Sequence, residues 1–131
     1  MEPGPIVDAL LAHRVEFVLV GSAARLLLGD AVEPADVDVV VAGSSTNRAA
    51  VVSALIELDA SVVENDRLHR LTQATVLPWE WSWKVVTAYG PVDMIVRFID
   101  GSGFDEHDAF ATDVWVDGGR SLRCHGTRHL Q

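Results

Sequence analysis

The chain has 131 residues, and 10 Lys and Arg against 19 Asp and Glu leave a formal net charge of −9. This length and a hydrophobic content of 49% predict one globular domain over residues 1–131. The acidic balance argues against binding in a DNA groove, and the single cysteine, Cys124, excludes an internal disulfide. The sequence shows no apolar run long enough to span a membrane and no signal-peptide pattern, so we expect a cytoplasmic protein.

The first half of the chain alternates between predicted helices and strands. Apolar residues at helical spacing indicate helices, and runs of β-branched residues indicate buried strands. Glycine is expected to end the second helix at Gly29, and Gly43 to Thr46 form a turn that offers an N-cap. The predicted elements are a helix over Pro5–His13, a strand over Glu16–Val20, a helix over Ala23–Leu28, a strand over Asp36–Val41 and a helix over Asn47–Leu58.

The second half is predicted to consist of strands. They cover Ser61–Val63, Trp79–Thr87 and Val92–Phe98, followed by a hairpin in which Val114–Val116 and Leu122–Cys124 flank Asp117-Gly118-Gly119. Glu64–Arg70 and Asp100–His107 are predicted as loops, the second held to the core by Phe104 and Phe110. The order α-β-α-β-α, then strands and a C-terminal hairpin, predicts an α/β (α+β) fold with a mixed sheet covered by helices.

Two aspartates lie within a strand that otherwise looks buried. Because side chains alternate along a strand, Asp36 and Asp38 point to the same face. Their like charges repel each other, and a divalent cation such as Mg²⁺, which prefers oxygen ligands, would compensate. The alternative for this short pattern is a strand end at which both carboxylates are solvated.

A Gly-Ser pair lies where the first strand meets the following helix. Gly21 lets a ligand approach the backbone closely, and the free N–H groups and hydroxyl at Ser22 can bind a phosphate. The alternative is an ordinary turn. The pair and the two aspartates are separated by one helix, so neighbouring strands can bring phosphate and metal together.

Together these residues resemble a known family. Val20-Gly21-Ser22, thirteen residues, and then Asp36-Val37-Asp38-Val39 are similar to the signature of the nucleotidyltransferase fold shared with DNA polymerase β. Ala24-Arg25 extends the match to minimal nucleotidyltransferases, and Val92-Asp93-Met94-Ile95 resembles the strand that carries the third carboxylate of the family. The resemblance is closest to bacterial AbiE-type nucleotidyltransferases of toxin–antitoxin systems, and it covers about residues 6–125.

The resemblance implies a two-metal transfer of an NMP group from an NTP. Asp36, Asp38 and Asp93 would be the catalytic and metal-binding residues for Mg²⁺ or Mn²⁺, and Asp93 would help to deprotonate an acceptor hydroxyl. Gly21, Ser22 and Arg25 would be the nucleotide-binding residues. The acceptor would be a protein or RNA hydroxyl in a toxin–antitoxin or phage-defence system. Relatives continue into a basic helical region, whereas this chain ends at Gln131, so acceptor determinants are expected to be missing or to come from a partner.

Three tryptophans at every second position form a further pattern. Trp79, Trp81 and Trp83 are predicted to share one face of a strand, with Lys84 on the opposite face. The rings can pack within the sheet, stack on bases, or form a homodimer or partner surface. This leaves two further hypotheses. One is a catalytically silent module that binds a partner protein, and the other is a small-molecule nucleotidyltransferase with a pocket that holds a sugar.

Overall fold

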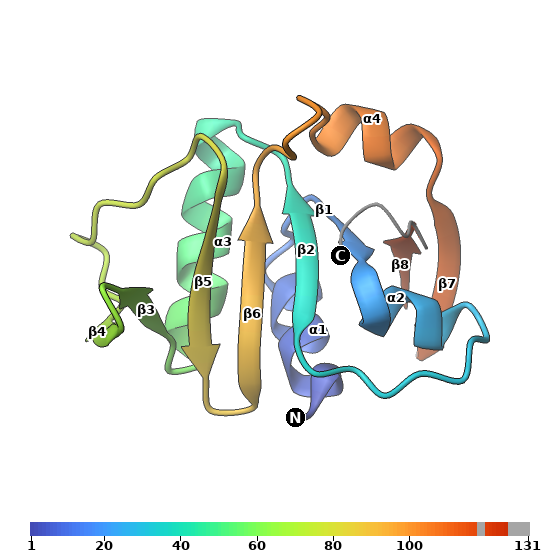
Figure 1. Ribbon diagram of the computed structural model, residues 1–131, viewed down its shortest axis with the longest axis horizontal. Helices are drawn as coiled ribbons and strands as arrows, with labels where there is room; N and C mark the ends of the chain where they lie inside the picture. The colour runs from blue at the N-terminus through green and yellow to red at the C-terminus, as the bar shows by residue number, and fades with distance from the viewer. Residues whose placement is uncertain (118–119, 126–131) are drawn as a thin grey trace.

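The computed structural model describes residues 1–117 and 120–125 (Figure 1). Helices and strands follow one another in the order predicted for the first half of the chain, and strands dominate the second half. The elements are α1 Pro3–Ala12, β1 Phe17–Val20, α2 Gly21–Leu27, β2 Val37–Val41, α3 Ser45–Glu57, β3 Ser61–Glu64, β4 Arg67–Arg70, β5 Ser82–Thr87, β6 Gly90–Ile95, α4 Phe104–Ala109, β7 Thr112–Asp117 and β8 Arg120–Cys124.

The strands form one mixed eight-stranded sheet in the order β4-β3-β5-β6-β2-β1-β8-β7. The pairs β2–β6 and β1–β8 are parallel, and the other neighbours are antiparallel. The four central strands align Val20 with Asp38, Asp38 with Asp93, and Asp93 with Lys84. This register places two aspartates and a lysine in one row across the middle of the sheet.

The main core lies between one face of the sheet and helices α1 and α3, which are seen behind β2, β6 and β5 in Figure 1. Alternation along β2 directs Val37, Val39 and Val41 into this core. On the opposite face, Val40 belongs to a smaller cluster, against which Phe104 at the start of α4 packs. The face with the smaller cluster is therefore only partly covered, and it is the face that carries Asp36 and Asp38.

Local sequence explains where the helices begin and end. Proline is accepted at the first positions of α1, and the Ser44 hydroxyl caps α3 by accepting a hydrogen bond from the Asn47 backbone N–H at 3.2 Å. Gly29 follows the end of α2 with a φ of 106°, as expected for a glycine that ends a helix. Within residues 1–117 and 120–125, no helix is both long and apolar enough to cross a membrane.

The predicted fold class is confirmed, and so is the C-terminal hairpin of β7 and β8, although its Gly118 and Gly119 lie outside the described residues.

The predictions of loops over Glu64–Arg70 and Asp100–His107 are wrong in part, because each segment contains regular structure. Residues 67–70 form β4, which pairs with β3 across a turn in which Asn65 and Asp66 have positive φ. All four residues of β4 are exposed, so this edge strand has no apolar alternation that could have revealed it.

The second predicted loop, Asp100–His107, instead contains the start of the short helix α4, which continues to Ala109. Its first turn carries Asp105 and Glu106, and the Glu106 carboxylate accepts a hydrogen bond from the Gly103 backbone N–H at 2.8 Å. This acidic start is typical of a helix N-terminus, but six residues are too few to show a helical repeat. Phe104 packs against the smaller cluster as predicted, whereas Phe110 is 74% exposed and does not hold the loop to the core.

Candidate active site

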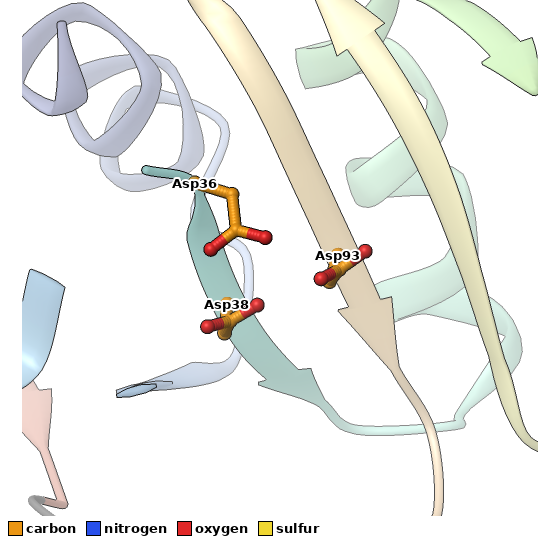
Figure 2. Close-up of side chains that lie close together, drawn as sticks. All are labelled: Asp36, Asp38 and Asp93. Atoms are coloured by element: carbon orange, nitrogen blue, oxygen red, sulfur yellow. The ribbon is translucent and has the colours of Figure 1, made fainter. Parts of the chain in front are cut away.

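Three carboxylates meet on the partly covered face of the sheet (Figure 2). Asp38 lies in β2, Asp36 directly precedes β2, and Asp93 lies in the neighbouring strand β6. One oxygen of each carboxylate lies within 4.8 Å of the other two. Their side chains are half-buried, so they are accessible to a ligand but poorly solvated. The parallel pairing of β2 and β6 thus unites residues that are 55 positions apart in the chain.

Gly21 provides the space that the Asp38 carboxylate occupies. It begins α2 directly after β1 with a φ of 70°, and a Cβ at this position would lie 2.2 Å from Asp38 Oδ2. Only glycine combines a left-handed backbone with such a close approach at no steric cost. Ser22 follows as the second residue of α2 and is half-buried. The structure therefore brings Gly21 next to the Asp38 carboxylate, with Ser22 as the following residue.

Arg25 pairs with an acidic residue outside the carboxylate cluster. It lies in the last turn of α2, and its Nε donates to Asp30 Oδ2 at 3.0 Å in the loop that follows. The side chain of Arg25 is thus engaged in an ion pair at the far end of a seven-residue helix. Its role in nucleotide binding remains a prediction, and it would require this ion pair to open.

Lys84 is a site residue that the sequence pattern did not reveal. It lies in β5 beside Asp93, and its Nζ is 3.5 Å from Asp93 Oδ1 and 3.9 Å from Asp36 Oδ2. Strand alternation correctly placed Lys84 opposite Trp83, but which residues shared its face depended on the register of β5 and β6. Among the described residues, Lys84 is therefore a cation that faces two of the three carboxylates.

Burial and mutual repulsion act on the protonation of the carboxyls. Desolvation by burial raises the pKa of Asp38 to about 7, and a hydrogen bond with Asp93 and the charges of Asp36 and Asp93 add to the shift. Desolvation also raises the pKa of Asp36 above its usual value. A hydrogen bond with Asp93 and the charge of Asp93 raise it further. Lys84 opposes both shifts. A carboxyl cluster that resists ionisation without a counter-charge is suited to a divalent cation.

The tryptophan pattern does not form the predicted surface. Strand β5 begins at Ser82, so Trp79 and Trp81 precede it, and the three rings do not share one strand face. Trp83 is buried in the main core, and Trp79 packs edge-on against it with 5.4 Å between ring centroids. Only Trp81 is exposed, at 55%. The three-ring face proposed for base stacking, a partner or a homodimer is therefore wrong, since two of its rings belong to the core.

A cavity of about 430 Å³ adjoins the carboxylates. Its lining comes from β2, from β6 and the segment after it, and from the start of β5: Asp38, Trp81, Ser82, Asp93, Ile95, Arg97, Phe98 and Ile99. The site therefore combines a cluster of oxygen ligands with an adjacent space that is partly aromatic and apolar. This combination is typical of a site that binds a metal together with an organic substrate.

Comparison with known proteins identifies the fold. No family model matches this sequence, and no curated protein matches it. A crystal structure of a protein from Thermotoga maritima, described as a "putative nucleotidyltransferase", is similar with a TM-score of 0.56 and 17% sequence identity. The match covers 92% of this chain and 73% of the other. The chain thus has a nucleotidyltransferase-like fold. The likeness to AbiE-type proteins stays a prediction from the sequence.

The residues of this site fit a divalent metal. Three carboxylates offer hard oxygen ligands from two adjacent strands, and their oxygens are close enough to share ions. Gly21 leaves Asp38 the room it occupies, and burial together with the neighbouring carboxylates raises the pKa of Asp38, so a bound cation would favour its ionised form. Lys84 supplies only one positive charge from a half-exposed side chain. The arrangement can therefore hold a divalent metal next to a polar substrate.

Proposed function

We propose that this chain is a metal-dependent nucleotidyltransferase that moves an NMP group from an NTP to a hydroxyl of a protein or RNA. The observation that carries the proposal is the meeting of Asp36, Asp38 and Asp93 on adjacent strands of a nucleotidyltransferase-like fold. Mg²⁺ or Mn²⁺ bound there would stabilise negative charge on the attacking and leaving oxygens. The predicted setting is a cytoplasmic toxin–antitoxin or phage-defence system.

The proposed roles combine the family resemblance with the positions of the residues. Asp36 and Asp38 would hold the metal, and Asp93 would hold it from the neighbouring strand and accept the proton of the acceptor hydroxyl. The hydroxyl oxygen forms a bond to the α-phosphorus, the bond to the bridging oxygen breaks, and pyrophosphate leaves with the electron pair. Ser22 and the backbone after Gly21 bind the phosphates, and Arg25 joins them if it leaves Asp30.

Metal-dependent nucleotide binding and transfer test this proposal. Calorimetry would measure binding of each NTP with and without Mg²⁺, and an α-labelled NTP would report transfer to protein or RNA in a bacterial lysate. Asp38→Asn should lower transfer by about 10²–10³-fold, the range found when one charge-stabilising group is removed from an active site. Asp66→Asn makes the same chemical change in the exposed turn between β3 and β4, and it should leave binding and transfer unchanged.

The main competing hypothesis is a silent module that binds a partner. Such a module would bind no NTP in the presence of metal, and Asp38→Asn and Asp66→Asn would behave alike. The loss of the three-ring surface removes the feature on which that hypothesis depended, because Trp83 is buried and Trp79 packs against it. A wild-type protein that neither binds NTP nor transfers label would refute the catalytic proposal.

A further inference from the structure

The cavity beside the carboxylates extends away from Gly21, toward the start of β5. Asp38 and Asp93 form one end of its lining, and Trp81, Arg97 and Ile99 contribute side chains beyond them. Asp93, Ile95 and Arg97 share one face because they alternate along β6 and its continuation. The cavity is therefore continuous with the face that carries the proposed metal site.

Trp81 and Arg97 are held together by the backbone. The carbonyl oxygen of Trp81 accepts hydrogen bonds from the backbone N–H groups of Val96 at 2.6 Å and Arg97 at 3.1 Å. These bonds continue the pairing of β5 with β6 by one step beyond Ser82 and Ile95. The chain bends at Trp81, just before β5, and the indole lies in the cavity wall instead of joining Trp83 in the core. Hydrogen-bonded backbone thus brings Trp81 and Arg97 to the wall of the same cavity.

The exposed side chains in this wall suit a flat, polar ring. Trp81 is 55% exposed and Ile99 is fully exposed, so both offer apolar surface that a ligand could cover. Among the described residues, the Arg97 side chain makes no hydrogen bond or ion pair. Indole and guanidinium planes are the groups on which nucleobases stack. Arg97 lines the same cavity, and its guanidinium is suited to bind a ligand oxygen.

The separation between Gly21 and the cavity suits the length of a nucleoside triphosphate. The proposed function puts the phosphate tail at Gly21 and Ser22, after β1, and the α-phosphate at the carboxylates of β2 and β6. β5 is the next strand, so the distance from β1 to β5 is three strand spacings, or about 14 Å. Trp81 also lies several residues farther along the strands than Gly21, so the path between them is longer than this spacing and leaves room for three phosphates, a ribose and a base. A nucleotide with its phosphate tail at Gly21 would therefore reach Trp81 with its nucleoside end.

We propose that the cavity formed by Trp81, Arg97 and Ile99 binds the nucleoside end of the donor NTP, with the base stacked on the Trp81 indole. This inference rests on the proposed function and adds the position of the base to it. Trp81 is then a nucleotide-binding residue that accepts any base, because stacking on an aromatic ring is tolerant of base identity. The acceptor hydroxyl approaches Asp93 from the open side of the sheet.

Inorganic tripolyphosphate and NTPs distinguish the two ends of the ligand. Calorimetry with Mn²⁺ would give the affinity of the wild-type protein for tripolyphosphate, ATP and CTP. We expect the NTPs to bind more tightly than tripolyphosphate. Trp81→Ala should weaken NTP binding by about 5–150-fold, the range for loss of one base–aromatic stack, and leave tripolyphosphate binding unchanged. Trp81→Phe should retain most of the affinity, since a phenyl ring still stacks.

Trp115→Ala is the matched control. Trp115 is 72% exposed and lies in β7, an edge strand that three strands separate from β6. The same substitution therefore removes an exposed indole far from the carboxylates. It should change neither affinity. Tryptophan fluorescence gives a second readout, because an NTP should quench the wild-type protein and Trp115→Phe but not Trp81→Phe. Tripolyphosphate should quench none of them.

Three results would overturn the inference, and they can be told apart. If Trp81→Ala binds NTPs as the wild type does, or loses tripolyphosphate and NTP affinity equally, the base lies elsewhere while metal-dependent phosphate binding stands. If Trp81→Ala lowers only transfer, the cavity belongs to the acceptor. If the wild-type protein binds neither ligand with Mn²⁺, the proposed function fails, and the inference fails with it.

Discussion

The two faces of β2 and of the residue before it differ in chemistry: one face is apolar and buried, and the other is acidic and half-buried. Val37, Val39 and Val41 are buried against the helices, and each contributes about 1.5–3 kcal/mol of hydrophobic stabilisation. On the other face, Asp36 and Asp38 carry like charges whose ionisation is unfavourable in the absence of a cation. The comparison shows that the valine face supplies the stability that lets the aspartate face keep an electrostatically unfavourable cluster.

Exchange of residue types between the two faces should produce the largest effect. Val39→Asp places an unpaired charge in the main core and should cost more than about 4 kcal/mol, enough to unfold the domain. Asp38→Val, one position away, should instead stabilise the metal-free protein at pH 8, because it removes repulsion. Urea unfolding followed by circular dichroism measures both. Equal destabilisation by the two substitutions would contradict the division between faces.

Gly21→Ala tests how tightly the aspartate face is packed. The added Cβ would clash with Asp38 Oδ2, and alanine is strained at a φ of 70°. We expect a loss of about 2–5 kcal/mol from strain and overpacking together. Gly29→Ala is the control, since its φ is 106° but no atom lies within 4 Å of the added Cβ, so backbone strain alone should cost about 1–2 kcal/mol. Similar losses at both positions would show that contact with Asp38 does not matter.

The pH dependence of stability should reveal Asp38 directly. The pKa of Asp38 is about 7 in the folded protein and 3.8 for an unperturbed aspartate, as expected in the unfolded chain, so the folded state binds more protons between these values. The contribution of Asp38 to stability therefore falls as pH rises from about 4 to 7, and above pH 7 the full penalty is present. The difference in unfolding free energy between Asp38→Asn and the wild type, measured without metal from pH 5 to 8, should grow with pH.

Addition of Mg²⁺ should reverse this trend. Metal binding requires ionised carboxylates, so affinity should increase as pH rises through 7 and the wild-type protein should gain stability at pH 8. Asp38→Asn should gain much less. A wild-type stability that is insensitive to Mg²⁺ at pH 8, measured by thermal unfolding, would argue against a metal site on this face.

Lys84→Met should give the smallest change in stability. Lys84 is half-exposed, so loss of its ion pairs should cost the metal-free protein at most about 1 kcal/mol. Because this charge faces Asp36 and Asp93, its removal should tighten binding of Mn²⁺, whereas Lys84→Arg should not. Titration with Mn²⁺ followed by electron paramagnetic resonance measures this difference. Weaker binding by Lys84→Met would show that Lys84 supports the metal instead of competing with it.

Local sequence was sufficient for much of the fold and for part of the site. Apolar spacing predicted the core helices and strands, and alternation placed Asp36 and Asp38 on one face, because both signals depend only on neighbouring residues. The same reasoning failed for β4 and α4, which are short and polar. It also failed for Trp79 and Trp81, since no local signal showed that the chain bends before β5.

The sequence by itself indicated two groups of candidate binding residues: Asp36 and Asp38 for a metal that prefers oxygen ligands, and Gly21 and Ser22 for phosphate. The family resemblance also pointed to Asp93. Only the tertiary structure decided how close Asp93 lies and that Lys84 joins the site, through the pairing of β2, β6 and β5. It also placed Trp81 in the adjoining cavity, through the bend before β5. The physical reason is that strand register and sheet order are set by packing of the whole domain, whereas side-chain alternation is set by each strand alone.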